Sequence, residues 1–205
     1  KQNLSKAYIL IKKQRDFIID MLKTDGLFLK YLSHEFKNDR TIVLRAIAQN
    51  SDAFLYASKQ LKHDRSFIIE AIRLDGFILV LLSEALKNDF EIVMAAVNQN
   101  GLVLACVSDE LKNNRDVVMT AARQDGLAIR FTESNELGSD PELLIAGLES
   151  NPALLEHLTP EGQNESSYVM AAVKKNGMML AYAGPDQQSN FDIVAAAVNQ
   201  NGNAL

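Results

Sequence analysis

Apolar residues recur along this chain in a pattern that is typical of short helices. The spacing i, i+1, i+4, i+5 places side chains on one face of an α-helix. This spacing returns about every 25 residues, for example at Ile42, Val43, Ala46 and Ile47, and again at Ile92, Val93, Ala96 and Val97. The other positions of these segments are mostly polar. Each segment is therefore predicted to be an amphipathic helix, which we name helix A.

A polar column sets the period of the repeat. Its members are Asp25, Asn50, Asp75, Asn100, Asp125, Asn151, Asn176 and Asn201. Seven steps separate them, and only one step has 26 residues instead of 25. Fixed-interval recurrence within one chain indicates tandem structural units. We expect about eight units, ending near residues 25, 50, 75, 100, 125, 151, 176 and 201, with an irregular unit at 126–141.

The four prolines locate the helix starts. Proline is favoured at the first helical position, so the residue before it is the N-cap. The prolines mark three points of the unit, and the equivalent residues in other units are also good caps. Helix A is capped by Asp39, Asp64, Asp89 or Asn114, depending on the unit. A short helix B begins after each residue of the polar column. A single helical turn begins after Ser33, Ser58, Ser83, Ser108 or Ser134. In the second unit, helix A is predicted from about Arg40 to Gln49.

Such short helices must stack to be stable. Isolated helices below ~12 to 15 residues are marginal in water. Small residues at the centre of helix A permit close approach, at Ala46, Ala71, Ala96, Ala121, Gly147, Ala172 and Ala197. The predicted fold is an all-α solenoid of the right-handed type that forms one domain over 1–205, on the order of 65 Å long. The extra residue between Asp125 and Ser134 predicts a change of superhelical curvature there.

Charge divides the chain into two parts. Residues 1–115 contain 17 Lys and Arg against 14 Asp and Glu, whereas residues 116–205 contain 4 against 12. The net charges are therefore +3 and −8. An acidic balance argues against nucleic acid as a partner, because such binding needs a sustained basic face. No apolar run is long enough for membrane insertion, so we expect a soluble, cytoplasmic-type monomer.

Residues for catalysis or cofactor binding are not grouped in this sequence. Cys106 has no cysteine partner, and no Cys/His cluster has metal-ligand spacing. His157 belongs to the column Tyr31, Tyr56, Leu81, Cys106, Phe131, His157 and Tyr182, which we interpret as core or groove wall. His34 is expected to be exposed. We therefore predict no enzyme, no cofactor and no metal site in this chain.

Basic residues form the most distinctive candidate site. They recur in two columns that a stack would align as adjacent stripes. The candidate interaction stripe comprises Lys37, Arg40, Lys62, Arg65, Lys87, Lys112 and Arg115, and Arg15 belongs to the same arginine column. The stripe is suited to an acidic partner or a phosphorylated ligand. Alternatively, the arginines and lysines pair with Asp39, Asp64, Asp89 and the acidic first turns as a solvated ladder, worth little for each pair.

The repeat resembles a known family. Segments such as NDRTIVLRAIAQN and LSEALKNDFEIVMAAVNQNGLVLACVSDELKNNRDVV are similar to the bacterial repeats catalogued as DUF4116, whose pattern has an L-K-N-D-R start, an apolar helix, an N-G and a Y-A-S end. The resemblance is strongest from Arg15 to Gly126 and weaker from Phe131 to Ser167. It implies a helical repeat module of large proteins, including suspected secreted effectors, with no defined activity.

Two functions remain open. The first is an interaction scaffold that binds an unidentified protein or peptide along one face of a superhelix. The alternative is a regulatory segment that holds anionic or phosphorylated ligands for a catalytic domain elsewhere. The last unit stops after three residues of a segment that elsewhere runs for about seven, so we expect an excerpt of a longer protein. The outer positions of helix A that vary most between repeats either encode recognition or vary simply because they are exposed; they include Arg45, Ala48, Glu70, Arg73, Arg123, Ala146 and Glu149.

Overall fold

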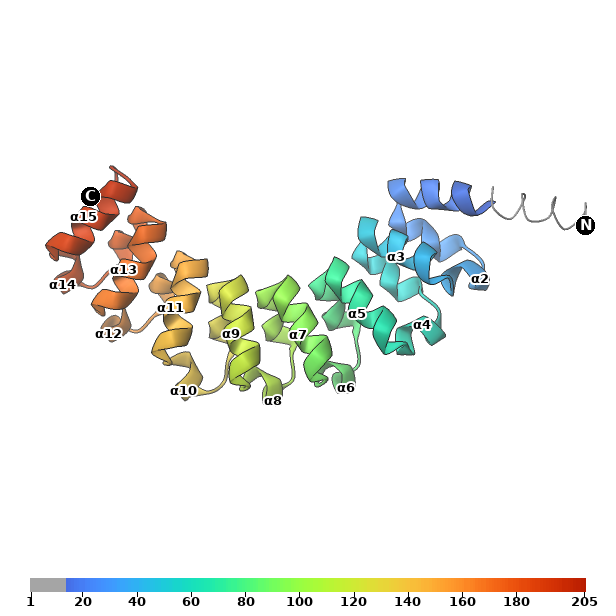
Figure 1. The fold of residues 1–205 in the computed structure, drawn as a ribbon, viewed down its shortest axis with the longest axis horizontal. Coiled ribbons are helices and arrows are strands. Elements are labelled where there is room, and N and C mark those ends of the chain that lie inside the picture. The colour runs from blue at the N-terminus through green and yellow to red at the C-terminus, as the bar shows by residue number, and fades with distance from the viewer. Residues whose placement is uncertain (1–13) are drawn as a thin grey trace, which may run out of the picture. The chain divides into compact units, whose positions relative to one another are not determined.

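A computed structural model describes residues 14–205, and every regular element in this range is a helix (Figure 1). The prediction of an all-helical repeat fold is thereby confirmed. The start of the first predicted unit lies outside the described residues. Contacts divide the chain into a first compact unit that ends at Ser83 and a second from Glu84 to Leu205. The expectation of a single domain stays a prediction.

The first compact unit alternates long, short and 3-10 helices. Residues 14–24 are helical. The elements that follow are η1 (Gly26–Tyr31), α2 (His34–Lys37), α3 (Arg40–Gln49), η2 (Ser51–Tyr56), α4 (Lys59–His63), α5 (Arg65–Leu74) and η3 (Gly76–Leu81). Here η denotes a 3-10 helix.

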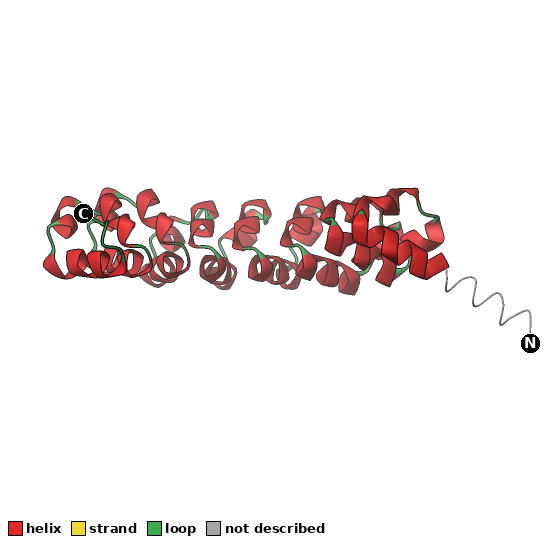
Figure 2. Cartoon of the chain, turned by 90° about the horizontal axis from the view of Figure 1, so that it is seen from above, coloured by secondary structure: helices red, strands yellow, loops and turns green. Residues whose placement is uncertain are grey.

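The second compact unit continues the same order. Its elements are α6 (Glu84–Lys87), α7 (Phe90–Gln99), η4 (Gly101–Cys106), α8 (Asp109–Lys112), α9 (Arg115–Gln124), η5 (Gly126–Phe131), α10 (Asn135–Gly138), α11 (Pro141–Ser150), η6 (Pro152–His157), α12 (Pro160–Gln163), α13 (Ser166–Lys175), η7 (Gly177–Tyr182), α14 (Pro185–Gln188) and α15 (Phe191–Gln200). Figure 2 shows that the described elements of both units are helices joined by short loops.

Polar side chains begin the helices at the expected residues. Asp39 precedes α3 and accepts hydrogen bonds from the backbone N–H groups of Thr41 and Ile42. Asn50 precedes η2 and accepts from the N–H of Asp52. These contacts satisfy N–H groups that have no partner within the helix. α3 covers the range expected for helix A, and its residues Ile42, Val43, Ala46 and Ile47 are buried.

The predicted short helix B is a six-residue 3-10 helix. Its backbone uses i→i+3 hydrogen bonds, such as the N–H of Phe28 to the carbonyl of Asp25 at 3.2 Å. A 3-10 helix has three residues per turn, so two turns fit between the polar cap and the next loop. The pattern of apolar residues alone does not separate the two helix types at this length.

Glycine permits close contact between a 3-10 helix and the next long helix. A Cβ atom on Gly101 would lie 2.3 Å from the carbonyl oxygen of Ala121 in α9. At Gly126 the equivalent atom would lie 2.0 Å from the carbonyl oxygen of Gly147 in α11. No side chain fits at either distance. Gly101 and Gly126 are therefore required by packing against the next long helix.

Glutamine side chains join successive repeats, a feature that the sequence analysis missed. The N–H of Gly101 donates to Gln124 Oε1 at 2.5 Å, and Gln124 Nε2 donates to the carbonyl of Gln99 at 3.5 Å. Gln200 makes the equivalent bonds to Gly177 and Lys175, at 2.6 and 3.1 Å. One side-chain amide thus hydrogen-bonds both a carbonyl at the end of one long helix and the first N–H of the 3-10 helix that follows. The signal was present, since Gln49, Gln99, Gln124 and Gln200 occupy one column.

Candidate interaction surfaces

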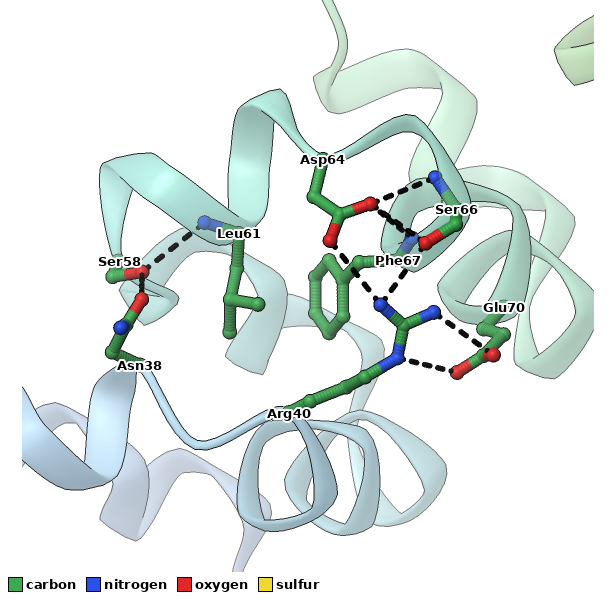
Figure 3. Close-up of polar contacts among 8 residues, drawn as sticks. All are labelled: Asn38, Arg40, Ser58, Leu61, Asp64, Ser66, Phe67 and Glu70. Atoms are coloured by element: carbon green, nitrogen blue, oxygen red, sulfur yellow. Dashed lines mark hydrogen bonds and ion pairs between the residues drawn. The ribbon is translucent and has the colours of Figure 1, made fainter.

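The arginine column lies at the first position of the long helices, where it contacts the next repeat. In the first compact unit, Arg40 NH1 lies 3.3 Å from a carboxylate oxygen of Asp64, and Arg40 NH2 lies 2.9 Å from Glu70 (Figure 3). Its guanidinium also lies over the ring of Phe67, 5.8 Å from the centroid. Arg15 pairs in the same way with Asp39.

The same contact occurs in the second compact unit. Arg115 Nε lies 3.1 Å from Asp140, and Arg115 NH2 lies 2.5 Å from Glu142. Arg65, at the start of α5, is exposed and also has an interaction partner. Arg15, Arg40 and Arg115 are therefore paired with aspartates that cap the next long helix, as the ladder interpretation expects. These pairs remain in contact with solvent, so each contributes little to stability.

Contacts in the ladder lower the pKa of its carboxyl groups. Partial burial raises the pKa of Asp39, but hydrogen bonds from Arg15 and the backbone outweigh it, so the pKa is below its ordinary value. The pKa of Asp64 is lowered by hydrogen bonds from Ser66 and from the N–H of Phe67. The hydrogen bond from Arg40 lowers the pKa of Glu70. At neutral pH these groups are carboxylates that pair with a neighbouring arginine, and Asp39 and Asp64 also cap a helix.

The lysines of the candidate stripe also have partners. Lys37 Nζ donates to the carbonyl of Lys30 at 2.8 Å, and Lys62 Nζ donates to the carbonyl of Leu55. These carbonyls lie near the ends of η1 and η2. Burial lowers the pKa of Lys62. Both ammonium groups therefore satisfy backbone acceptors at the end of a 3-10 helix.

Two other lysines of the column lie in the second compact unit and bind carboxylates. Lys87 Nζ lies 2.9 Å from Glu84, whereas Lys112 Nζ lies 3.5 Å from Asp109 and 3.8 Å from Glu133. Only 16% of each lysine side chain is exposed. The structure thus places all seven stripe residues at equivalent positions but shows each of them engaged within the protein. These contacts favour the ladder, and a role of the stripe in binding stays a prediction.

The histidines form no catalytic arrangement in the described residues. His34 is exposed, as expected. His157 is also exposed, so this member of its column lies at the surface and not in the core. Its Nε2 lies 3.4 Å from Arg130 NH1. Cys106 is half-buried. In this range no group of three or more His, Cys, Asp or Glu side chains is placed to hold a metal ion.

Grooves lie between long helices within each compact unit. In the first, a groove of about 530 Å³ between α3 and α5 is lined by Arg40, Thr41, Leu44, Arg45, Ala48, Glu70, Arg73 and Leu74. In the second, a groove of about 520 Å³ on α9, α11 and α13 is lined by Arg123, Glu142, Ile145, Ala146, Glu149, Ser150 and Lys175. Each groove therefore combines apolar side chains with charges of both signs.

The varied outer positions of helix A contribute to these grooves. Arg45, Ala48 and Arg73 are exposed in the first compact unit, and Arg123 and Glu149 are exposed in the second. The alanine at 146 is half-buried. The sequence analysis identified these positions by their variation between repeats, although it did not predict the grooves between them.

One family model matches the chain four times. It is a domain of unknown function (DUF4116), and it matches residues 14–62, 64–112, 91–137 and 167–205. The chain belongs to this family. DUF4116 repeats therefore account for most of the described residues, and the unmatched segment 138–166 falls in the region of weaker resemblance. No curated protein and no solved structure matched the chain.

The DUF4116 matches agree with the repeat seen in the structure. Two of the matched segments have 49 residues, about twice the spacing of the polar column. Each such segment holds two long helices with the 3-10 and one-turn helices between them. No helix in the described residues has the length and apolarity that crossing a membrane requires. The family description carries no activity, so function has to be argued from surfaces.

Proposed function

We propose that this chain is a binding scaffold, a helical solenoid that holds a protein or an extended peptide in the grooves between its long helices. The observation that carries the proposal is the presence of such a groove, of about 530 and 520 Å³, in each compact unit. Repeat proteins create extended surfaces from contacts between neighbouring repeats only. A peptide recognised residue by residue is the partner that fits a repeated groove.

The chemistry of the grooves supports a peptide of mixed character. In the first compact unit, Arg45 and Arg73 flank Leu44 and Leu74, and Glu70 is already held by Arg40. Cationic side chains beside an apolar floor suit acidic residues that alternate with apolar ones. We propose binding and not catalysis: the hydrogen-bond partner of His157 in the described residues is the Arg130 guanidinium, which is a cation and not a nucleophile.

The alternative, an anion-binding regulatory segment, has weaker support. Its candidate residues already bind carboxylates or backbone carbonyls, for example Arg115 with Asp140 and Lys62 with Leu55. An added phosphate would have to displace these partners. An acidic ligand could still bind to Arg45 and Arg73, the cationic side chains that line the first groove.

The experiment compares two groove variants with a surface control in the complete chain. Ala48→Trp narrows the first groove and Ala146→Trp narrows the second, since both residues line a groove. Lys59→Glu is the control, because Lys59 is exposed on α4 outside both grooves. A partner identified with the natural chain should bind at least tenfold more weakly to one or both groove variants and equally to the control.

The charge hypothesis requires a different set of variants. Lys37, Lys62, Lys87 and Lys112 are replaced together by Gln, which can still donate to the carbonyls as Gln163 donates to that of Leu155. Loss of binding in this variant, with both groove variants unaffected, overturns the groove proposal and favours the anion-binding alternative. Binding that all variants retain contradicts both.

A further inference from the structure

The irregular repeat of the second compact unit contains a cavity beside a glycine, at a position where other repeats carry a lysine or glutamine. The cavity has about 250 Å³ and is lined by Ile129, Arg130, Thr132, Ser134, Asn135, Gly138, Ser139, Leu144, Leu154, His157 and Leu158. We name it the Gly138 cavity. It lies apart from the grooves described above, so the inference drawn from it is independent of the proposed scaffold function.

Gly138 stands in the column of Lys37, Lys62, Lys87, Lys112, Gln163 and Gln188. Four of these side chains donate to a carbonyl near the end of the preceding 3-10 helix. Lys37 and Lys62 do so with an ammonium group, while Gln163 and Gln188 do so with an amide, to Leu155 and Leu180 at 3.2 Å. A nitrogen donor at the end of an aliphatic chain is therefore the group that this position normally supplies.

Gly138 supplies no such donor. The carbonyl of Arg130, equivalent to those of Lys30 and Leu55, accepts no hydrogen bond from the described residues. The hydroxyl oxygen of Thr132 is buried and has no partner either. A Cβ atom on Gly138 would meet only Thr132 Cγ2, at 3.7 Å, so the space beside the backbone is open. Two acceptors thus border a cavity of mixed lining, with Leu144, Leu154 and Leu158 on its apolar side.

Acidic residues predominate in the segment around the cavity, although the charged side chain in its lining is the guanidinium of Arg130. Residues 130–165 contain eight Asp and Glu and a single basic residue, Arg130, apart from His157. The guanidinium of Arg130 is 3.4 Å from His157 Nε2. Glu161 and Glu165 line an adjoining hollow of about 460 Å³ that shares Gly138, Leu144 and Leu158 with the cavity. An ammonium group near this surface is stabilised by the surrounding carboxylates.

We propose that the Gly138 cavity binds a primary ammonium group on an alkyl chain, which takes the place of the lysine side chain of the other repeats. Its methylene groups contact Leu144, Leu154 and Leu158, and its ammonium donates to the Arg130 carbonyl and the Thr132 hydroxyl. Such a group is carried by a free polyamine or by a lysine side chain of a partner. A buried acceptor without a partner destabilises the fold, and a bound donor offsets this cost in part.

The test uses n-butylammonium as the probe and the complete chain, with heat of binding measured by isothermal titration. We expect one saturable site in the natural chain and binding at least tenfold weaker for 1-butanol, which has the same length without the charge. Gly138→Ala keeps most of the cavity open and should bind within about twofold. Gly138→Lys and Gly138→Met fill it and should weaken binding at least tenfold.

Two further measurements make the test independent of folding defects. Gly138→Lys should raise the melting temperature, whereas Gly138→Met should not match it, because only lysine supplies the donor. Thr132→Val keeps the cavity shape but removes the unpaired hydroxyl, and should weaken binding of the probe about threefold or more. Melting curves of each variant show whether it is folded before binding is measured.

The proposal is overturned if 1-butanol binds as tightly as the probe, if Gly138→Lys binds it as the natural chain does, or if phosphate binds at the cavity and the ammonium does not. Spermidine and Nα-acetyl-lysine methylamide then distinguish the two sources. Tighter binding of spermidine assigns the cavity to free polyamines. Tighter binding of the lysine derivative assigns it to a side chain of a partner protein.

Discussion

At the scale of the residue, the glycine after each polar cap shows how closely two repeats approach. Gly101 has no room for a Cβ atom because the carbonyl of Ala121 lies 2.3 Å from its ideal position. Gly202 follows an equivalent asparagine, but none of the described residues lies within 4 Å of its Cβ position. The two glycines therefore have the same sequence environment and different packing.

Gly101→Ala is expected to destabilise the chain by about 2 kcal/mol or more, because backbone atoms have to separate to admit the methyl group. Gly202→Ala is the matched control and should change the free energy of unfolding by less than about 0.5 kcal/mol. Urea unfolding followed by circular dichroism measures both. Equal effects at the two sites would contradict the role assigned to close packing.

At the scale of the element, the 3-10 helices depend on side chains that lie outside them. Lys62 reaches back from α4 to the carbonyl of Leu55 at the end of η2. Gln163 has the same role toward the carbonyls of Leu155 and Glu156 in η6. An amide and an ammonium are thus alternative caps for the same kind of helix.

Lys62→Ala should lower the free energy of unfolding by about 1 kcal/mol, since it leaves a carbonyl without its donor. Lys62→Gln should leave the free energy of unfolding nearly unchanged, because the amide still donates a hydrogen bond and carries no charge that has to be buried. Burial already lowers the pKa of Lys62. Lys59→Ala, on the exposed side of α4, is the control. Thermal unfolding of the three variants tests this; a loss in Lys62→Gln as large as in Lys62→Ala would refute the capping role.

At the scale of the whole molecule, the Arg and Asp contacts within both compact units predict sensitivity to acid. The pKa values of Asp39, Asp64, Glu70 and Asp140 are lowered in the folded chain. The unfolded chain therefore binds protons at a higher pH than the folded one. This stabilisation is complete above the unfolded pKa values, near 4, and is lost as pH falls through the folded values.

We expect the free energy of unfolding to fall steeply between about pH 5 and pH 3. The double variant Asp64→Asn, Asp140→Asn should flatten this dependence, because Asn still caps a helix, as Asn114 does for α9. Glu156→Gln alters an exposed carboxylate outside the ladder and should leave the slope unchanged. Urea titrations at several pH values provide the measurement. If the slope is unchanged in the double variant, the Arg and Asp contacts do not cause the dependence of stability on pH.

The sequence by itself determined the elements of this protein and their order. Caps such as Asp39 and Asn50, the apolar face at Ile42 and Val43, and the 25-residue period are local features, because each depends on backbone groups within a few residues. Family membership followed from the same features. The change of curvature at the irregular repeat stays a prediction.

Only the tertiary structure decided which polar groups are free and where space remains. Lys62 and Arg40 look like an exposed basic stripe in sequence, yet their partners lie on other elements, at Leu55 and Asp64. The grooves beside Ala48 and Ala146 and the cavity at Gly138 likewise exist only between elements. Hydrogen bonds and packing between repeats depend on distances in space, which a pattern along the chain does not contain.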